Sequence, residues 1–361
     1  MVEEAKPKSD CFEVKRRPRV LVLLLGSIGD VVRALPLLGR IRRAMPDAFI
    51  AWAVEPKSRD ILEGHPWLDG LIVYERDRAP WSFIAFLWRI RRERFDLVLD
   101  LQRHLKSGLV SFASGAPERL GFAPENTKEF NHLFSTRYIE PQPEMRLKLL
   151  QYQAFGDSLG LAPAPIEFGI EPSVAEREAA DKLLESAPEP RLGIILGSSW
   201  PSRVYFADAI AQVARELAQP CDGLPGLFPV LLGGRAEAEL AREVLDAADG
   251  LPMLNLVGKT SLRLLATVFT RCAVAFGPDS GPMHIAAAVG CPIVSLWGAT
   301  APERSAPWGF ADLAVRGAIP CHPCYLRRCP IGRECMRRIE PGQIVQMIRR
   351  VLEQKFSRKQ L

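Results

Sequence analysis

The feature that most constrains the fold is an alternation of short apolar runs with amphipathic stretches of helical spacing, and this alternation occurs twice along the chain. In the first series the apolar runs are Val20–Leu25, Ile50–Val54, Gly70–Val73 and Leu97–Leu101. In the second series they are Leu192–Leu196, Val230–Leu232, Leu254–Val257, Val274–Phe276 and Ile293–Leu296. Strands that alternate with helices form a parallel sheet with helices on both faces. We therefore predict two open α/β domains that face each other across a cleft.

Helical spacing predicts the elements between these runs. The predicted helices include Val31–Met45, Leu147–Leu159, Ala207–Leu217, Ala236–Ala247, Leu262–Phe269 and Gly342–Gln354. The chain between Pro141 and Pro190 is rich in proline and acidic residues, so the interdomain connection is predicted there. The predicted boundaries are a loose tail at 1–17, a first domain at 18–165, a linker at 166–190, a second domain at 191–340 and a final helix at 341–361.

The composition is that of a soluble globular protein. Of the 361 residues, 48% are apolar and 25% are charged, a balance that does not suit a membrane-embedded or disordered chain. No apolar run approaches the ~18 residues that a membrane span needs, so we expect a cytoplasmic location. The chain lacks segments typical of nucleic-acid-binding modules, and we expect no nucleic-acid partner.

Arginines gather in two of the predicted helices. The two clusters are Arg33, Arg40, Arg42 and Arg43, and Arg89, Arg91, Arg92 and Arg94. Such clusters are either solvated helix faces or sites of attraction for a phosphorylated acceptor or an anionic membrane surface. The segment Trp81–Trp88 just before the second cluster fits an interfacial amphipathic helix and an ordinary core-facing helix equally well. Peripheral contact with the inner-membrane surface is therefore an open expectation.

A glycine-containing loop follows the first predicted strand, with the sequence Gly26-Ser27-Ile28-Gly29-Asp30. Its two glycines allow a sharp turn and a close approach to a ligand. Asp30 is either a first-turn acid that the helix dipole favours or a general base aimed into the cleft. The loop lacks the third glycine of a dinucleotide-binding fingerprint and the Lys-Ser/Thr of a P-loop.

In the second series, a tight polar turn at Gly277–Gly281 separates a strand from a short helix predicted at Pro282–Val289, which Gly290 ends. Asp279, a hydroxyl and free backbone N–H groups at a helix N-terminus favour an anion such as phosphate. His284 lies further along this helix and is either a packed residue or one that faces the ligand.

Two further loops follow strands of the second series. Ser198 and Ser199 suit a phosphate group, and Arg203 is either a surface arginine or a bidentate clamp on a diphosphate. Glu237, after a Gly-Gly pair, is either a first-turn helix acid or a carboxylate for ribose hydroxyls.

Four of the eight cysteines form the cluster Cys321-x2-Cys324-x4-Cys329-x5-Cys335, with His322 inside it. The spacing is not that of a two-pair zinc ribbon. A small structural metal site, clustered thiols and a redox or disulfide role all remain open, and none of them makes the cysteines catalytic.

Motifs along nearly the whole chain resemble those of glycosyltransferase family 9, the bacterial heptosyltransferases of lipopolysaccharide inner-core assembly. The motifs are Gly26–Asp30, Ala34–Pro36, His65–Asp69, Phe95–Gln102, Lys106–Ser107, Arg119–Phe122, Asn255–Leu262, Asp279–His284, Trp297–Pro302 and Cys321–Met336. The Asp-Ser-Gly-Pro-Met-His block is the most specific of them. One departure concerns Arg203 and Tyr205, since the family usually carries a lysine and then an aromatic residue after the phosphate loop.

The resemblance implies a GT-B fold of two Rossmann-like domains. The first would bind a phosphorylated glycolipid acceptor and the second an ADP-sugar, with ADP-L-glycero-D-manno-heptose as the donor. Transfer would invert the anomeric centre and need neither a metal nor a cofactor. The site residues implied or suggested are Asp30 as the base; Ser198, Ser199, Arg203, Glu237, Asp279, Ser280, Gly281 and His284 for the donor; and Gly29, Arg33, Arg103 and Lys106 for the acceptor.

Three rival functions remain. The chain could be a catalytically degenerate GT-B protein that binds a nucleotide or scaffolds envelope synthesis, or a family member that uses another nucleotide-sugar. A dinucleotide-dependent oxidoreductase would need an acid after the second strand, which Glu55 offers, but the glycine pattern does not match.

Overall fold

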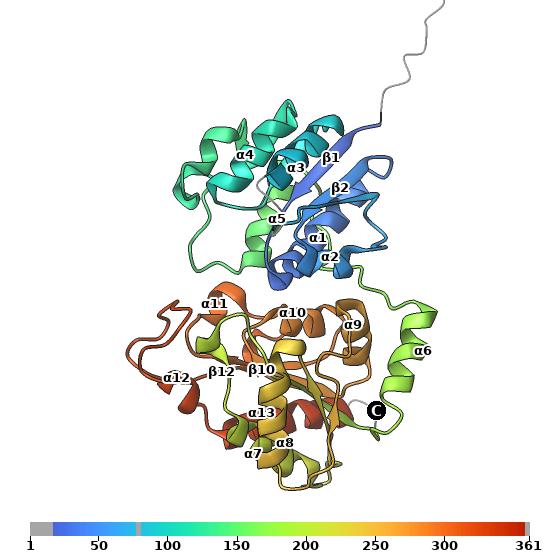
Figure 1. Cartoon of the computed structure of the whole chain (residues 1–361), viewed down its shortest axis with the longest axis vertical. Helices are drawn as coiled ribbons and strands as arrows, with labels where there is room; N and C mark the ends of the chain where they lie inside the picture. The colour runs from blue at the N-terminus through green and yellow to red at the C-terminus, as the bar shows by residue number, and fades with distance from the viewer. Residues whose placement is uncertain (1–16, 77–80, 358–361) are drawn as a thin grey trace, which may run out of the picture.

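The computed structural model describes residues 17–76 and 81–357, which form two parallel six-stranded sheets in two layers of the molecule (Figure 1). The strand order is β3-β2-β1-β4-β5-β6 in the first sheet and β12-β11-β10-β7-β8-β9 in the second. Counted from its own first strand, the second sheet repeats the order of the first. In each sheet the direction in which successive strands are added reverses beside its first strand, between β1 and β4 and between β7 and β10. Open α/β sheets bind ligands at such a switch point, outside the carboxyl ends of the strands.

The strands are short and mostly buried. Those of the first sheet are β1 Arg19–Leu23, β2 Phe49–Val54, β3 Gly70–Val73, β4 Leu97–Asp100, β5 Glu118–Gly121 and β6 Arg137–Tyr138. Those of the second are β7 Arg191–Ile195, β8 Phe228–Leu232, β9 Leu254–Asn255, β10 Val274–Pro278, β11 Ile293–Trp297 and β12 Ala314–Arg316. The nine apolar runs noted in the sequence all coincide with strands, because a strand buried on both faces needs apolar residues throughout.

Helices cover both faces of each sheet. Around the first sheet they are α1 Ile28–Ala44, α2 Pro56–Leu62, α3 Trp81–Arg92, α4 Leu105–Ser114 and α5 Lys148–Ser158, and α6 Val174–Leu183 follows. The second sheet has α7 Ala207–Ala218, α8 Ala238–Ala247, α9 Leu262–Thr270, α10 Gly281–Ala288, α11 Pro302–Ser305, α12 Glu334–Arg337 and α13 Pro341–Ser357. A short 3₁₀ helix, η2 at Asn131–Phe134, packs against α4.

Helix α6 and the short strands β5, β6 and β12 were not predicted from the sequence. Helix α6 lies inside the stretch 166–190 and begins with a capping box, in which Ser173 accepts from the backbone N–H of Glu176 and the Glu176 side chain accepts from Ser173 N–H. It packs against α9, and Arg263 pairs with Glu176. The loose tail predicted at 1–17 lies outside the described residues except for Arg17.

The two layers meet at the N-termini of α1 and α10. Helix α1 is buried on most sides because it packs against α5 of its own layer and α10 of the other. A Cβ on Gly29 would lie 2.7 Å from His284 Cδ2, and one on Gly281 would lie 2.8 Å from the Ile28 Cβ. Glycine at both positions therefore allows the two helix starts to approach each other.

Candidate active site

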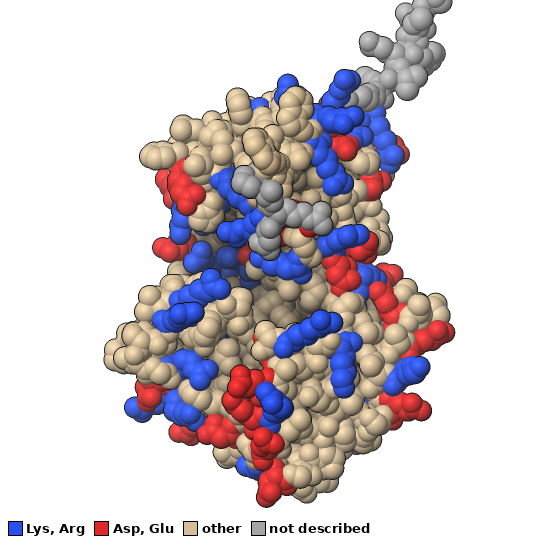
Figure 2. All heavy atoms as spheres, viewed as in Figure 1, with Lys and Arg blue, Asp and Glu red and all other residues tan. Residues whose placement is uncertain are grey.

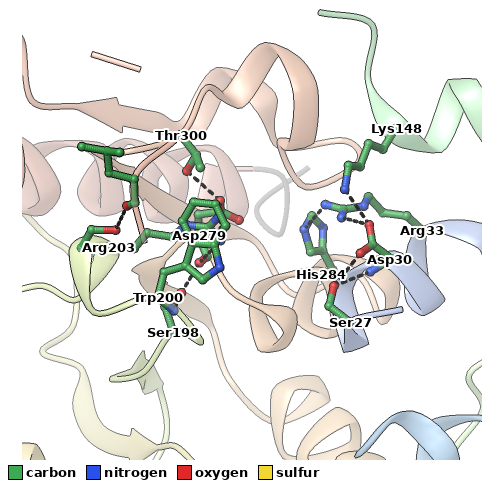
Figure 3. Close-up of polar contacts among 12 residues, drawn as sticks. Ser27, Asp30, Arg33, Lys148, Ser198, Trp200, Arg203, Asp279, His284 and Thr300 are labelled. Atoms are coloured by element: carbon green, nitrogen blue, oxygen red, sulfur yellow. Dashed lines mark hydrogen bonds and ion pairs between the residues drawn. The ribbon is translucent and has the colours of Figure 1, made fainter. Parts of the chain in front are cut away.

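Asp30 lies in the first turn of α1, at the carboxyl end of β1. Ser27 caps the helix by accepting from Asp30 N–H, and its hydroxyl donates to Asp30 Oδ2 at 2.8 Å. Asp30 Oδ1 accepts from Lys148 Nζ at 2.8 Å and from Arg33 Nη2 at 2.7 Å. The phenol of Tyr152 lies 3.4 Å from the same oxygen. Two cations and two hydroxyls thus hold the carboxylate in one orientation. Figure 3 shows Lys148, Arg33 and Ser27 around it.

These partners set the charge of Asp30. Burial alone would raise the pKa of the carboxyl, but the opposing charges of Lys148 and Arg33 outweigh it and hold the pKa well below its usual range. Burial lowers the pKa of the Lys148 ammonium, although Asp30 acts in the opposite direction. Asp30 is therefore an ionised carboxylate at neutral pH.

His284 connects Asp30 to the second layer. Its Nε2 lies 2.7 Å from Arg33 Nη1, and Arg33 also pairs with Asp30. Burial, reinforced by the positive charge of Arg33, lowers the pKa of His284 well below its ordinary value, so the ring is neutral. Arginine can only donate, and so Nε2 is the unprotonated ring nitrogen and accepts this bond.

Asp279 anchors a second polar cluster at the carboxyl end of β10. Its Oδ2 accepts from Thr300 Oγ1 at 2.7 Å and pairs with Arg203 Nη1 at 3.0 Å. Its backbone carbonyl accepts from Ser198 Oγ at 2.8 Å, and the Arg203 guanidinium lies 4.0 Å from the Trp200 ring centroid. Figure 3 shows this cluster and the Asp30 cluster on two sides of one space.

A cavity of about 340 Å³ adjoins these clusters at the carboxyl ends of β7 and β8. Its lining residues are Ser27, Ile28, Lys57, Ile195, Gly197, Ser198, Ser199, Gly233, Gly234, Glu237, Thr260, Leu262, Leu265, Ser280, Gly281 and Pro282. The lining combines aliphatic side chains with hydroxyls, glycine backbone and the charged side chains of Lys57 and Glu237. Such a mixture suits an apolar ring attached to a polar sugar phosphate.

Glu237 lines this cavity and also stabilises a local turn. Its Oε2 accepts from Gly234 N–H at 2.7 Å, as a first-turn helix acid does, and its carboxyl lies directly against Gly197. The structural and ligand-binding interpretations of Glu237 are therefore compatible.

The basic residues predicted for an acceptor lie at two different places. Arg103 packs over the Phe122 ring and donates to Gln151, and it interacts electrostatically with Asp30 and with Arg304. Lys106 lies 4.0 Å from the Tyr74 ring centroid, near Glu55. Arg103 thus belongs with the Asp30 cluster, whereas no contact joins Lys106 to it among the described residues.

Several buried polar atoms in the cleft have no protein partner. They are Arg33 Nε, Arg203 Nε, Ser280 Oγ, Arg304 Nε and Tyr325 OH. Native proteins leave few such groups, and donors gathered at one place indicate a ligand with many acceptor oxygens. Figure 2 shows Lys and Arg side chains on both sides of the hollow between the layers, which favours an anionic ligand.

The cysteine cluster does not join this site. Cys321, Cys324, Cys329 and Cys335 are free thiols. Burial raises the pKa of the Cys335 thiol, and the other three cysteines lie near enough to contribute. Within residues 17–76 and 81–357, no group of three or more His, Cys, Asp or Glu side chains could hold a metal ion.

The comparison with protein families decides what kind of site this is. The model for glycosyltransferase family 9 (heptosyltransferase) matches residues 84–334. The chain belongs to this family. It is therefore a glycosyltransferase, and the resemblance drawn from the sequence motifs is confirmed.

Named relatives of this family 9 chain are similar over most of their length. Lipopolysaccharide core heptosyltransferase OpsX of Haemophilus influenzae is 26% identical over 296 residues, which cover 81% of this chain and 83% of the relative. Lipopolysaccharide heptosyltransferase 2 of Escherichia coli K12 is 26% identical over 320 residues, covering 82% and 88%.

Solved structures confirm the predicted GT-B fold. A family 9 glycosyltransferase from Veillonella parvula superposes with a TM-score of 0.77 at 22% identity, covering 93% of this chain and 97% of that one. The E. coli heptosyltransferase WaaC with ADP superposes with a TM-score of 0.70 at 20% identity, covering 92% and 99%.

Sequence reasoning missed several residues of the candidate site. Lys148 and Tyr152 come from α5, whose position was predicted but whose orientation was not, and Arg304 follows a quoted motif. The sequence carried no signal for Lys148, since a lone lysine at the start of a helix has no distinctive spacing.

Proposed function

We propose that this chain transfers a heptose from an ADP-activated donor to an inner-core sugar of lipopolysaccharide, with inversion at the anomeric carbon. One observation carries the proposal: an ionised carboxylate and a diphosphate-sized set of donors lie across one cleft in a family 9 chain. The relatives named above are lipopolysaccharide heptosyltransferases, and E. coli WaaC has been solved with ADP and with ADP-2-deoxy-2-fluoro heptose. Those names support the donor and acceptor proposed here.

Asp30 would act as the general base. It accepts a proton from an acceptor hydroxyl while that oxygen attacks the anomeric carbon from the face opposite ADP. Paired with Lys148 and Arg33, the carboxylate is a weak base, because both cations favour its ionised form. An anionic acceptor that drew Lys148 to itself would raise the basicity of Asp30 when the substrate is in place.

The departing diphosphate would be held by the second layer. Arg203 offers a guanidinium oriented by Asp279 and Trp200, and Ser198 and Ser199 offer hydroxyls beside it. Backbone N–H groups at the start of α10 add the positive end of a helix dipole. Donors fixed before the reaction stabilise leaving-group charge without reorganising.

The acceptor would be a phosphorylated, lipid-linked sugar. Five cations, namely Arg33, Arg103, Lys148, Arg203 and Arg304, surround the two carboxylates Asp30 and Asp279. This excess of positive charge matches a diphosphate together with an anionic acceptor. No helix among the described residues has the length and apolarity to span a bilayer.

The test combines donor binding and transfer. Thermal unfolding is followed with ADP, UDP, GDP and NAD, and ADP release is then followed with ADP-heptose and a purified core acceptor. Selective stabilisation by ADP is expected, since a ligand at about 100 times its Kd adds ~2.7 kcal/mol. Stabilisation by UDP or GDP alone would contradict the proposed donor, and binding of ADP without transfer to any core acceptor would indicate a degenerate enzyme.

A further inference from the structure

The helices α3 and α4 carry apolar residues on their outer faces as well as their inner ones. In α3 the inward side chains Phe86 and Ile90 are buried, yet Trp81, Ile84 and Trp88 are 74%, 44% and 66% exposed. These three positions are spaced i, i+3 and i+7, which places them on one side of the helix. The outer face of α3 is thus an apolar stripe without a covering element among the described residues.

A second stripe runs along α4. Leu105, Leu109 and Phe112, spaced i, i+4 and i+7, are 41%, 38% and 61% exposed. Helix α4 packs beside α3 and also contacts η2, where Leu133 and the preceding residue Phe130 are 68% and 72% exposed. The eight exposed residues of α3, α4 and η2 therefore form one surface, the α3–α4 face. In Figure 2 the surface at the upper left, where these helices lie in Figure 1, is mostly tan.

Positive charge borders this face. The last turn of α3 carries Arg89, Arg91 and Arg92, all exposed, and Arg91 lies against the carboxyl-terminal end of α4 at Gly115. Arg119 lies at another edge, 5.8 Å from the Phe112 ring centroid. Exposed tryptophans beside arginines are typical of surfaces that insert shallowly among anionic headgroups.

The α3–α4 face lies close along the chain to the acceptor side of the cleft. Helix α4 begins at Leu105, two residues after Arg103, which interacts electrostatically with Asp30. A lipid-linked acceptor with its chains in a membrane under this face would extend its sugars toward Arg103 and Asp30.

We propose that the α3–α4 face docks on an anionic phospholipid bilayer and presents the cleft to acceptors held in that bilayer. The apolar stripes enter the headgroup region, and the flanking arginines pair with phosphate groups. The part of this inference that concerns presentation of the cleft rests on the proposed function, in which the acceptor is lipid-linked. Binding of the face to the membrane does not depend on that function.

The first test measures co-sedimentation of the full chain with vesicles of phosphatidylethanolamine and phosphatidylglycerol, and with phosphatidylcholine vesicles. Binding to the anionic vesicles is expected, weakening with salt. The double variant Trp81→Ser/Trp88→Ser should bind at least about tenfold more weakly, because two aromatic side chains no longer leave water. The matched control Val174→Ser/Ile331→Ser changes two residues of similar exposure, 62% and 61%, in other parts of the molecule and should bind as the wild type does.

A charge test addresses the arginines separately. Arg89→Glu/Arg92→Glu should abolish the preference for anionic vesicles, whereas Arg242→Glu/Arg350→Glu, with the same charge change on exposed positions of α8 and α13, should retain it. No binding to anionic vesicles, or equal binding by the wild type and both patch variants, would overturn the proposal. A wild-type dimer that Trp81→Ser/Trp88→Ser dissociates would also overturn it, since a second copy would then be the occupant.

Turnover distinguishes this inference from the proposed function. The tryptophan variant should match the wild type on de-acylated core oligosaccharide and lose activity on the same core anchored in vesicles. Failure of the wild type on both acceptors would contradict the proposed function, while the vesicle-binding result would still decide the role of the face.

Discussion

At the scale of single residues, the candidate site depends on how a few charges are balanced. Asp30 is surrounded by Lys148, Arg33 and two hydroxyls, and its pKa is held low as a result. The sequence predicted Asp30 from its place after a strand, because helix starts at such positions face a cleft. It could not predict Lys148, which lies 118 residues away and reaches Asp30 only through the packing of α5 on α1.

Replacing Lys148 should change the pH dependence of the reaction. Lys148→Met removes one of the two cations on Asp30, so the pKa of Asp30 rises and the acid limb of kcat/KM moves to higher pH. The profile is measured through the acid range beside Lys182→Met, an exposed lysine on α6. Superimposable acid limbs for Lys148→Met and the wild type would contradict this description of Asp30.

Asp100 predicts a pH dependence of stability. The carboxyl at the end of β4 is 1% exposed, and burial raises its pKa to about 7 although Asn131 and the Gln102 N–H donate to it. Between about pH 4 and 7 the native state keeps a proton that the unfolded chain has lost, so the free energy of unfolding decreases as pH rises. Asp100→Asn should remove this pH-dependent part of the free energy of unfolding.

Urea unfolding at several pH values tests it. The stability of the wild type relative to Asp100→Asn should fall across that window and stay constant above it. Asp249→Asn, which removes an exposed carboxylate, serves as the control. Parallel curves for the wild type and Asp100→Asn would show that Asp100 is ionised in the native state.

At the scale of elements, the contact between α1 and α10 joins the two halves of the site. The sequence predicted both helices and the loops before them, since apolar runs and turn residues mark these elements locally. It did not predict that Gly29 and Gly281 would bring the helices together, because such contacts depend on how distant segments pack. For the same reason, the sequence could not decide whether the apolar residues of α3 face the core or the solvent. Periodicity alone does not show which apolar face of a helix is covered by other elements.

The substitution Gly29→Ala should disturb this junction. The new methyl would lie 2.7 Å from His284 Cδ2, and overpacking of this kind costs about 1–3 kcal/mol. Displacement of His284 should also weaken turnover, because Arg33 would lose its orientation toward Asp30. Gly342→Ala in α13, where no atom lies within 4 Å of the added methyl, is the control for both Tm and kcat. Wild-type values of both quantities in Gly29→Ala would show that the junction tolerates a wider spacing.

At the scale of the whole molecule, two sheets of identical strand order place their switch points on opposite sides of one cleft. The alternation of strands and helices predicted this architecture, and the family 9 match and superposed structures confirm its class. The edge strand β6 escaped prediction because both of its residues are exposed and polar or amphipathic, so it carries no apolar signal. In the proposed function, the two layers have different roles. The first layer supplies the base, and the second supplies the groups that hold the diphosphate.

The most direct test of this division compares Asp30→Asn with the wild type in two quantities measured side by side, kcat with ADP-heptose and a core acceptor, and the Kd for ADP. Asparagine keeps the size of the side chain and removes its basicity, so kcat should fall by about 10²–10⁴. The Kd for ADP should stay near the wild-type value, because the phosphate clamp of Ser198, Arg203 and Asp279 lies on the other layer. Unchanged kcat, or equal losses in kcat and ADP affinity, would contradict the account.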